Sequence, residues 1–285
     1  MNNLQVIALV EDVLGVQPST VIFQPFGHNS VTYEATLPGR SVIVRMNADA
    51  SVFAATERNI AVLRGLGLPV PVVLASDLSK TRYPFAYLLL EKIPGRDLRY
   101  ELAGMTPVQM TRLAEQIVGY QRRALTLPLG TGYGYVGIGE TGPYASWREL
   151  VRSEGEPIQV SRFEAYLRQV PPACFLDDIT VKNVIIQDGE LQGLIDFDCV
   201  CYGDPLYWLA LTAVGVVSDV GAPGQFYVSE LKRLWGLTPP QESVLAFYCA
   251  LMAQDFVRGM ADQETPEWKS RMQEATEKWL ARCAD

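Results

Sequence analysis

Two short apolar segments on either side of a glycine constrain this chain more than any other feature. Residues 184–187 and 191–195 are rich in aliphatic and β-branched side chains, and Gly189 lies between them. This pattern predicts two short strands that pair as a β-hairpin. Asn183 comes directly before the first strand and Asp196 directly after the second. The hairpin should therefore bring an amide oxygen and a carboxylate together at its open end.

A third oxygen-bearing side chain, Asp178, lies upstream of Asn183 with four residues between them. Phosphoryl transfer from a nucleoside triphosphate needs a hard cation held by oxygen ligands and one further carboxylate to orient the attacking hydroxyl. The three side chains could meet both needs. Asp178 is the candidate catalytic base, and Asn183 and Asp196 are the candidate Mg²⁺ ligands. The alternative for any one of them alone is an ordinary turn or cap residue.

Composition excludes several other classes of function. The net charge of −8 disfavours binding to nucleic acid, and it is compatible with a cationic substrate. His28 is the only histidine, which rules out a His-rich zinc site and leaves no evident Ser–His triad. The five cysteines form no regular framework and are typical of buried thiols in a reducing compartment.

The N-terminal residues lack a basic segment, and no apolar run reaches the ~20 residues that a membrane-spanning helix needs. We therefore expect a cytoplasmic protein without a membrane or nucleic-acid partner. Its oligomeric state is not indicated by the sequence.

One ordered set of residues resembles the catalytic loop and metal motif of the aminoglycoside phosphotransferase family. The set consists of Asp178, Asn183, Asp196 and the later Gly203-Asp204-Pro205. That family shares a protein-kinase-like fold with the choline kinases. Its catalytic loop usually begins His-Gly-Asp, and the His holds the loop in place, whereas this chain has Leu176 at that position. Many relatives also have an Asp where this chain has Trp208.

The resemblance implies an α+β fold with two lobes. Residues 1–92 would form a small antiparallel sheet with one key helix, and residues 93–285 would form a larger, mostly helical lobe, with a hinge near 91–95. The residue pattern agrees, because strand-like segments dominate before Lys92 and helix-like segments after Asp97.

The family also implies a nucleotide site for ATP or GTP in the first lobe. Gly27, Asn29 and Ser30 lie in a turn whose backbone N–H groups could bind phosphates. Arg45, at the end of a predicted strand, would reach the phosphates and pair with Glu57 on the next helix, with an ordinary surface ion pair as the alternative.

The hinge backbone from Glu91 to Ile93 would bind the adenine ring, according to the same resemblance. The segment from residue 131 to 148 is similar to the middle of hygromycin-type phosphotransferases, where it lies on the substrate side. Tyr144 and Trp147 in this segment, with Asp198 and Asp255, are the candidate acceptor-binding residues.

The sequence thus predicts a small-molecule kinase that transfers the γ-phosphate of ATP or GTP to a hydroxyl of an aminoglycoside-like or other acceptor. A non-catalytic nucleotide-binding or ligand-binding protein is one alternative. A sugar, a choline-like amine or a macrolide are alternative acceptors. A protein Ser/Thr kinase is disfavoured because Asp198, not Gly, follows Phe197.

Overall fold

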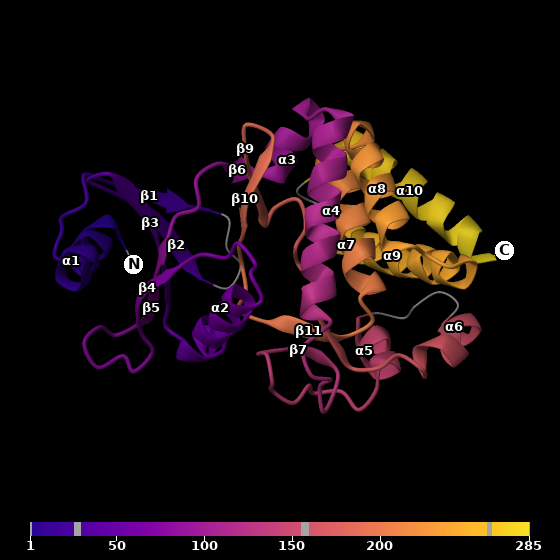
Figure 1. Cartoon of the computed structure of the whole chain (residues 1–285), viewed down its shortest axis with the longest axis horizontal. Helices are drawn as coiled ribbons and strands as arrows, with labels where there is room; N and C mark the ends of the chain where they lie inside the picture. Colours follow the sequence, from indigo (N-terminus) through magenta and orange to yellow (C-terminus); the bar gives the residue numbers. More distant parts are fainter. Residues whose placement is uncertain (1, 26–29, 155–159, 261–263, 285) are drawn as a thin grey trace. The chain divides into compact units, whose positions relative to one another are not determined.

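The computed structural model describes residues 2–25, 30–154, 160–260 and 264–284. Its internal contacts divide the chain into two compact units, drawn in Figure 1. The first unit comprises Met1–Pro94 and the segment Phe197–Cys199, and the second comprises Gly95–Asp196 and Val200–Asp285. The chain therefore returns to the first unit directly after Asp196. The second lobe predicted from the sequence, residues 93–285, includes this returning segment, whereas the contacts assign it to the first unit.

A five-stranded antiparallel sheet, in the order β1-β2-β3-β5-β4, forms most of the first unit. Its strands are β1 (Thr20–Gln24), β2 (Val31–Leu37), β3 (Arg40–Asn47), β4 (Val73–Asp77) and β5 (Ala86–Glu91).

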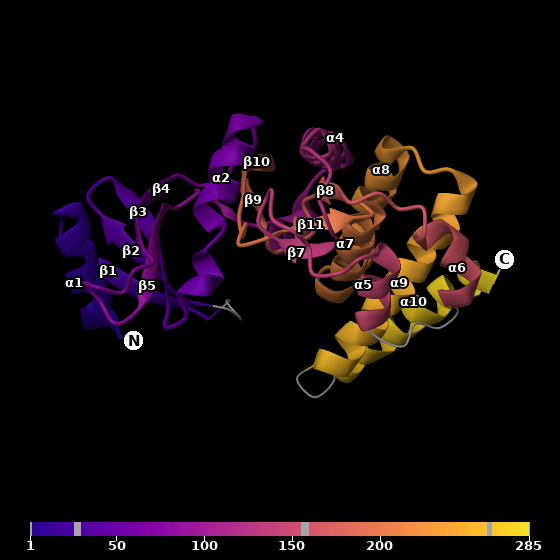
Figure 2. The same cartoon turned by 90° about the horizontal axis from the view of Figure 1, so that it is seen from below.

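Helix α1 (Asn3–Leu14) packs against this sheet, as Figure 2 shows. Asn2 and Gln5 form a reciprocal capping box at its start, and Gly15 ends it in the left-handed conformation with φ 70°. The buried core between helix and sheet consists of Val6, Leu9, Val10, Tyr33, Ala35, Leu37, Val42, Val44, Met46, Phe85, Tyr87 and Leu89.

Strand β3 directs alternate side chains to opposite faces of the sheet. Val42, Val44 and Met46 belong to the core that α1 covers. Arg45 therefore lies on the opposite face, in register with Thr32 on β2. The sheet thus separates a packed face from a face that carries the Arg45 guanidinium.

Between β3 and the helix that carries Glu57, the chain first forms a 3-10 turn. A short 3-10 turn spans Ala50–Phe53, and the Asp49 side chain caps it by accepting a hydrogen bond from the Ser51 amide at 2.9 Å. The α-helix α2 begins only afterwards and spans Thr56–Gly65. Its buried face carries Thr56, Asn59, Ile60 and Leu63.

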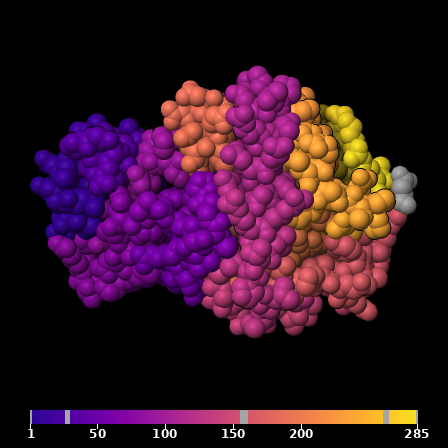
Figure 3. Space-filling view, viewed as in Figure 1, coloured from indigo at the N-terminus to yellow at the C-terminus, as the bar shows by residue number. Residues whose placement is uncertain are grey.

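Helices form most of the second unit. They are α3 (Leu98–Glu101), α4 (Pro107–Ala124), α5 (Trp147–Ser153), α6 (Val160–Leu167), α7 (Leu206–Asp219), α8 (Gln225–Trp235), α9 (Pro239–Met260) and α10 (Pro266–Ala284), with 3-10 turns at Leu102–Gly104 and Ala222–Gly224. Helix α9 contacts both α7 and α10, and α4 packs against α8 with its outer face at the surface in Figure 3. None of the described helices combines the length and apolar character needed to cross a membrane.

Two three-stranded sheets complete the second unit, in the orders β10-β9-β6 and β7-β11-β8. Their strands are β6 (Arg96–Asp97), β7 (Gly134–Val136), β8 (Ala173–Phe175), β9 (Val184–Gln187), β10 (Glu190–Leu194) and β11 (Val200–Gly203). Asp188 and Gly189 join β9 to β10 with φ values of 55° and 77°, the left-handed geometry that tight hairpin turns require. The hairpin predicted from the sequence is therefore present.

The turn at Gly189 is coupled to the start of α4. A Cβ atom at Gly189 would overlap the side-chain amide of Gln109, and the Gln109 Oε1 atom accepts hydrogen bonds from Thr106 in the capping box of α4. At Gly39, the turn glycine between β2 and β3, φ is similarly positive at 78°, but a Cβ atom would meet nothing within 4 Å.

We expect Gly189→Ala to be more destabilising than Gly39→Ala. Both changes place alanine in the left-handed region, at a cost of roughly 1–2 kcal/mol. Only Gly189→Ala also displaces Gln109 and disrupts the α4 cap, which should lower the free energy of unfolding by about 1 kcal/mol more. Chemical denaturation of both variants measures this difference, and equal losses would show that the turn and the cap are independent.

Candidate active site

The loop between β8 and β9 holds Asp178 and Asn183 in a hydrogen-bonded arrangement. Asp178 is exposed, and its Oδ1 atom accepts a hydrogen bond from the Thr180 hydroxyl at 3.1 Å. The Asn183 side-chain amide donates to the Asp178 carbonyl at 2.9 Å. This second hydrogen bond joins the backbone of Asp178, the predicted base, to the side chain of Asn183, a predicted metal ligand. We call residues 176–183 the catalytic loop.

The β9–β10 hairpin brings Asn183 and the segment before Asp196 together. The Ile195 amide donates to the Asn183 carbonyl at 3.0 Å, just beyond the paired residues Val184 and Leu194. Asp196 itself is exposed and has φ 68°, a left-handed conformation that non-glycine residues rarely adopt. Such conformations are concentrated at functional sites, where the surrounding structure enforces them.

The carboxylates of this region raise one another's pKa values. Desolvation, followed by the charge of Asp196, raises the pKa of Asp178 to about 6, although part of its carboxylate is accessible to solvent. Desolvation, then the charges of Asp178 and Asp196, raises the pKa of Asp177 to about 8. Negative charge is therefore crowded at the hairpin, and a bound cation would relieve this repulsion.

The donor set fits one divalent cation shared with phosphate groups. The described residues contain no cluster of three or more His, Cys, Asp or Glu side chains that could hold a metal alone. Mg²⁺, however, is commonly bound through one or two carboxylates together with phosphate oxygens and water. Asp196 supplies a carboxylate, and the Asn183 amide oxygen remains available because its nitrogen is bonded to Asp178.

The expected ion pair between Arg45 and Glu57 is not formed. The Arg45 guanidinium instead makes a bidentate pair with Asp198, at 2.8 Å to Oδ1 and 2.6 Å to Oδ2. Glu57 is exposed in the first turn of α2 and accepts a hydrogen bond from the Ser76 hydroxyl at 2.6 Å. The prediction was wrong because the partner of Arg45 comes from a distant part of the sequence.

Asp198 belongs to the segment Phe197–Cys199, which packs within the first unit. The Thr56 hydroxyl donates to Asp198 Oδ1 at 2.8 Å, and the buried Asn59 amide donates to the Phe197 carbonyl at 2.9 Å. The Asp198 carboxylate is thus engaged by Arg45 and Thr56. These contacts favour a structural role for Asp198 over the predicted role in acceptor binding.

Other predicted nucleotide-binding residues lie in the first unit. Ser30 accepts a hydrogen bond from Arg45 Nε at 3.2 Å, whereas Gly27 and Asn29 lie outside the described residues. The Glu91 amide donates to the Val72 carbonyl at 2.9 Å. For the Ile93 amide, no hydrogen bond to another described residue is found. The roles of these residues in nucleotide binding stay predictions.

Trp147 is a core residue and not part of an exposed substrate mouth. It is fully buried, its indole N–H donates to the Tyr248 hydroxyl at 2.7 Å, and its ring makes edge contacts with Phe175 and Tyr207. The prediction of an acceptor contact is therefore wrong. Tyr144 is half-buried, and its hydroxyl accepts a hydrogen bond from Ser153 at 2.9 Å.

Acidic and aromatic side chains of the second unit affect one another's ionisation. Tyr135 is 38% exposed, yet desolvation of its hydroxyl end, followed by neighbouring groups that include Asp177 and Glu154, raises its pKa. Burial, then the charge of Asp255, raises the pKa of Glu154. The role of Asp255 in acceptor binding stays a prediction.

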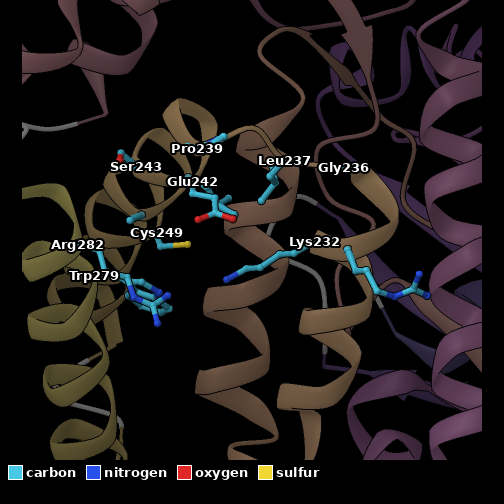
Figure 4. A pocket seen from close by; sticks show the side chains of 12 residues that line it. Lys232, Gly236, Leu237, Pro239, Glu242, Ser243, Cys249, Trp279 and Arg282 are labelled. Carbon is cyan, nitrogen blue, oxygen red and sulfur yellow. The ribbon is translucent and has the colours of Figure 1, made fainter. Parts of the chain in front are cut away.

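One cavity among the described residues lies elsewhere, between α8, α9 and α10. It encloses about 550 Å³, and Figure 4 shows its lining, with Lys232 extended into the space beside Cys249 and Trp279. No residue of the catalytic loop lines it. Lys232 and Arg282 lie in the last turns of α8 and α10, where basic side chains stabilise the carbonyl ends of helices.

Comparisons with known proteins give the family and the fold of the chain. Residues 23–247 match the model of the phosphotransferase enzyme family. No curated protein matches the chain in sequence.

Solved structures of aminoglycoside phosphotransferases share the fold at low sequence identity. The crystal structure of aminoglycoside phosphotransferase APH(4)-Ia is 17% identical, with a TM-score of 0.68 and 97% of each chain covered. A thermostable mutant of that protein, in a ternary complex with AMP-PNP and hygromycin B, has a TM-score of 0.70 at 17% identity, covering 98% of this chain and 99% of the other. The GDP complex of aminoglycoside 2'-phosphotransferase-IIIa has a TM-score of 0.68 at 14% identity, with 99% of each chain covered.

The fold of these structures is the protein-kinase-like α+β fold that the sequence predicts. The match to the family model covers most of the chain and includes the whole catalytic loop and hairpin. The chain is therefore a phosphotransferase and belongs to the phosphotransferase enzyme family.

Proposed function

We propose that this enzyme transfers the γ-phosphate of ATP or GTP to a hydroxyl group of a small, cationic acceptor in a Mg²⁺-dependent reaction. The observation that carries the proposal is the hydrogen bond between the Ile195 amide and the Asn183 carbonyl, which ties together the two ends of the hairpin where the oxygen ligands lie. Asp178 is joined to this end of the hairpin, because the Asn183 side-chain amide donates a hydrogen bond to the Asp178 carbonyl.

Asp178 acts as the general base in this proposal. Its carboxylate is accessible, and its pKa, raised to about 6, is closer to neutral pH than that of an ordinary aspartate. This makes it a better proton acceptor that is still ionised at pH 7. It receives the proton of the acceptor hydroxyl as the oxygen forms a bond to the γ-phosphorus. The bond between that phosphorus and the bridging oxygen breaks, and the nucleoside diphosphate leaves.

Asn183 and Asp196 would hold the metal ion. When bound, Mg²⁺ would neutralise the charge on the phosphate oxygens. Asn183 would contribute an amide oxygen from a side chain that is fixed by its bond to the Asp178 carbonyl. Asp196 would contribute a carboxylate from a residue in the left-handed conformation, with φ 68°.

The proposed acceptor is a polyhydroxylated amine. Glu154 and Asp255 are acidic side chains of the second unit, and burial, then the charge of Asp255, raises the pKa of Glu154. Ammonium groups would be attracted there. Two similar structures of aminoglycoside phosphotransferases are complexes with hygromycin B and with kanamycin. The net charge of −8 also favours a cationic acceptor.

A panel of acceptors tests the proposed reaction. Aminoglycosides, simple sugars, choline-like amines and macrolides would each be incubated with Mg²⁺ and either ATP or GTP, and the release of nucleoside diphosphate measured. We expect turnover with at least one polyhydroxylated amine. Nucleotide binding without turnover of any acceptor would instead support a non-catalytic nucleotide-binding protein.

Asp178→Asn should abolish turnover while nucleotide binding is retained. Loss of the base should lower kcat by at least about 100-fold, with nucleotide affinity changed by less than about twofold. Asp188→Asn is the matched control, because Asp188 is an exposed turn residue whose left-handed conformation asparagine also tolerates. Full activity of the Asp178→Asn variant would remove Asp178 from its role.

Arg45→Ala should raise the KM for nucleotide more than the KM for acceptor, because we place the guanidinium at the nucleotide phosphates. Asp198→Asn should have the same type of effect, since Asp198 orients Arg45 through two hydrogen bonds. Glu57→Gln serves as the control and should leave both values unchanged, because Glu57 contacts Ser76 and not Arg45. Steady-state kinetics with both substrates distinguishes these outcomes. A stronger effect of Glu57→Gln than of Asp198→Asn would contradict the assignment.

A further inference from the structure

We propose that Gln121 and Trp208 are positioning residues that hold the catalytic loop from its two sides and thereby set the location of Asp178. The inference rests on the proposed role of Asp178 as the base. Neither side chain belongs to the motif that identifies the family. Both act through the backbone of the loop, and neither carries the chemistry itself.

Gln121 binds both polar backbone groups of Leu176. Its side-chain nitrogen donates to the Leu176 carbonyl at 2.6 Å, and its side-chain oxygen accepts from the Leu176 amide at 3.1 Å. The Gln121 side chain is fully buried on α4, and Leu176 is 2% exposed. Two hydrogen bonds in a buried setting fix the position of a residue much more tightly than one. The loop therefore starts from a defined point at the end of β8.

Trp208 binds the other side of the same loop. Its indole N–H donates to the Ile179 carbonyl at 3.3 Å, and the side chain is fully buried on α7. The start of α7 is fixed in turn, because Asp204 Oδ1 accepts a hydrogen bond from the Leu206 amide at 3.0 Å. The ring of Trp208 also packs against Trp235, with centroids 5.8 Å apart. The indole N–H is therefore presented from a rigid support.

The two contacts flank the residues that matter for chemistry. Leu176 precedes Asp177 and Asp178, and Ile179 follows them directly. With the backbone held at both of these positions, the Asp178 carboxylate has little freedom to move away from an attacking hydroxyl. Displacement of a reacting group by about 1 Å can reduce catalysis by roughly 100-fold.

The loop is held through its backbone and not through the side chain of Leu176. The Leu176 side chain cannot form a hydrogen bond, yet its backbone is held by Gln121. Trp208 in turn holds the Ile179 carbonyl. Polar support of the loop thus comes from two buried side chains on α4 and α7.

The experiment compares Gln121→Leu and Trp208→Phe with the control Trp268→Phe. Trp268 is also a buried tryptophan, and its indole N–H donates at 3.0 Å to the hydroxyl of Ser218, which is not one of the loop residues 176–183. For each variant kcat, the KM for nucleotide and the melting temperature are measured. Trp208→Phe is the milder of the two loop variants, so the test stands even if Gln121→Leu does not fold.

We expect both loop variants to lower kcat by about 10- to 100-fold while the KM for nucleotide changes by less than about twofold. Trp268→Phe should lower the melting temperature by a similar amount to Trp208→Phe and keep the wild-type kcat. An unchanged kcat in Trp208→Phe would overturn the proposal. So would an equal loss of kcat in Trp268→Phe, because that result would show a general effect of reduced stability.

Amide hydrogen exchange separates failure of this inference from failure of the proposed function. If the wild-type protein shows no turnover, the role of Asp178 as base is lost, but the exchange rates of residues 176–183 still report whether the loop is held. Faster exchange in Gln121→Leu and Trp208→Phe, and not in Trp268→Phe, would support loop positioning. Equal exchange in all variants would contradict it.

Discussion

The pairing of β9 with β10 is the constraint on which the candidate site depends. Asn183 and Asp196 are separated by the whole hairpin in sequence, and each would be an ordinary polar residue without it. The hydrogen bond from the Ile195 amide to the Asn183 carbonyl closes the hairpin at 3.0 Å. Because strand register is fixed by the turn at Asp188 and Gly189, a change in that turn would move Asn183 and Asp196, the two proposed metal ligands, at once.

The site combines features that are unfavourable for stability with rigid support from elsewhere. Asp196 has a left-handed backbone conformation, and the pKa values of Asp177 and Asp178 are raised, which means that their ionised forms are disfavoured in the fold. Buried hydrogen bonds from Gln121 and Trp208 act in the opposite direction by fixing the backbone of the loop. Such local strain offset by surrounding structure is expected where chemistry needs crowded charge.

The sequence predicted features that depend on local patterns. The hairpin of β9 and β10 followed from two apolar segments around Gly189. The partner of Arg45 could not be predicted in this way, because Asp198 lies 153 residues further along the chain. The prediction that Trp147 contacts the acceptor was wrong, because a short helix gives no periodic pattern that distinguishes a core aromatic residue from an exposed one.

Gln121 differs from its neighbours on the buried face of α4 in being polar. It occupies the buried face of α4 together with Leu113 and Ile117, where the helical spacing predicts an apolar residue. A polar side chain at such a position is buried only if it finds hydrogen-bond partners. Its partner, the backbone of Leu176, is not visible in the sequence because backbone groups are the same for every residue. The signal could have marked Gln121 as important without showing what it binds.

The central claim is that the hairpin places Asn183 and Asp196 to bind one metal ion together with the nucleotide phosphates. A crystal structure of the enzyme with Mg²⁺ and AMP-PNP tests it most directly. The account predicts a single shared Mg²⁺ with an oxygen of Asn183 and an oxygen of Asp196 each at about 2.1 Å from the ion. A metal–nucleotide complex bound without either of these oxygens would contradict it.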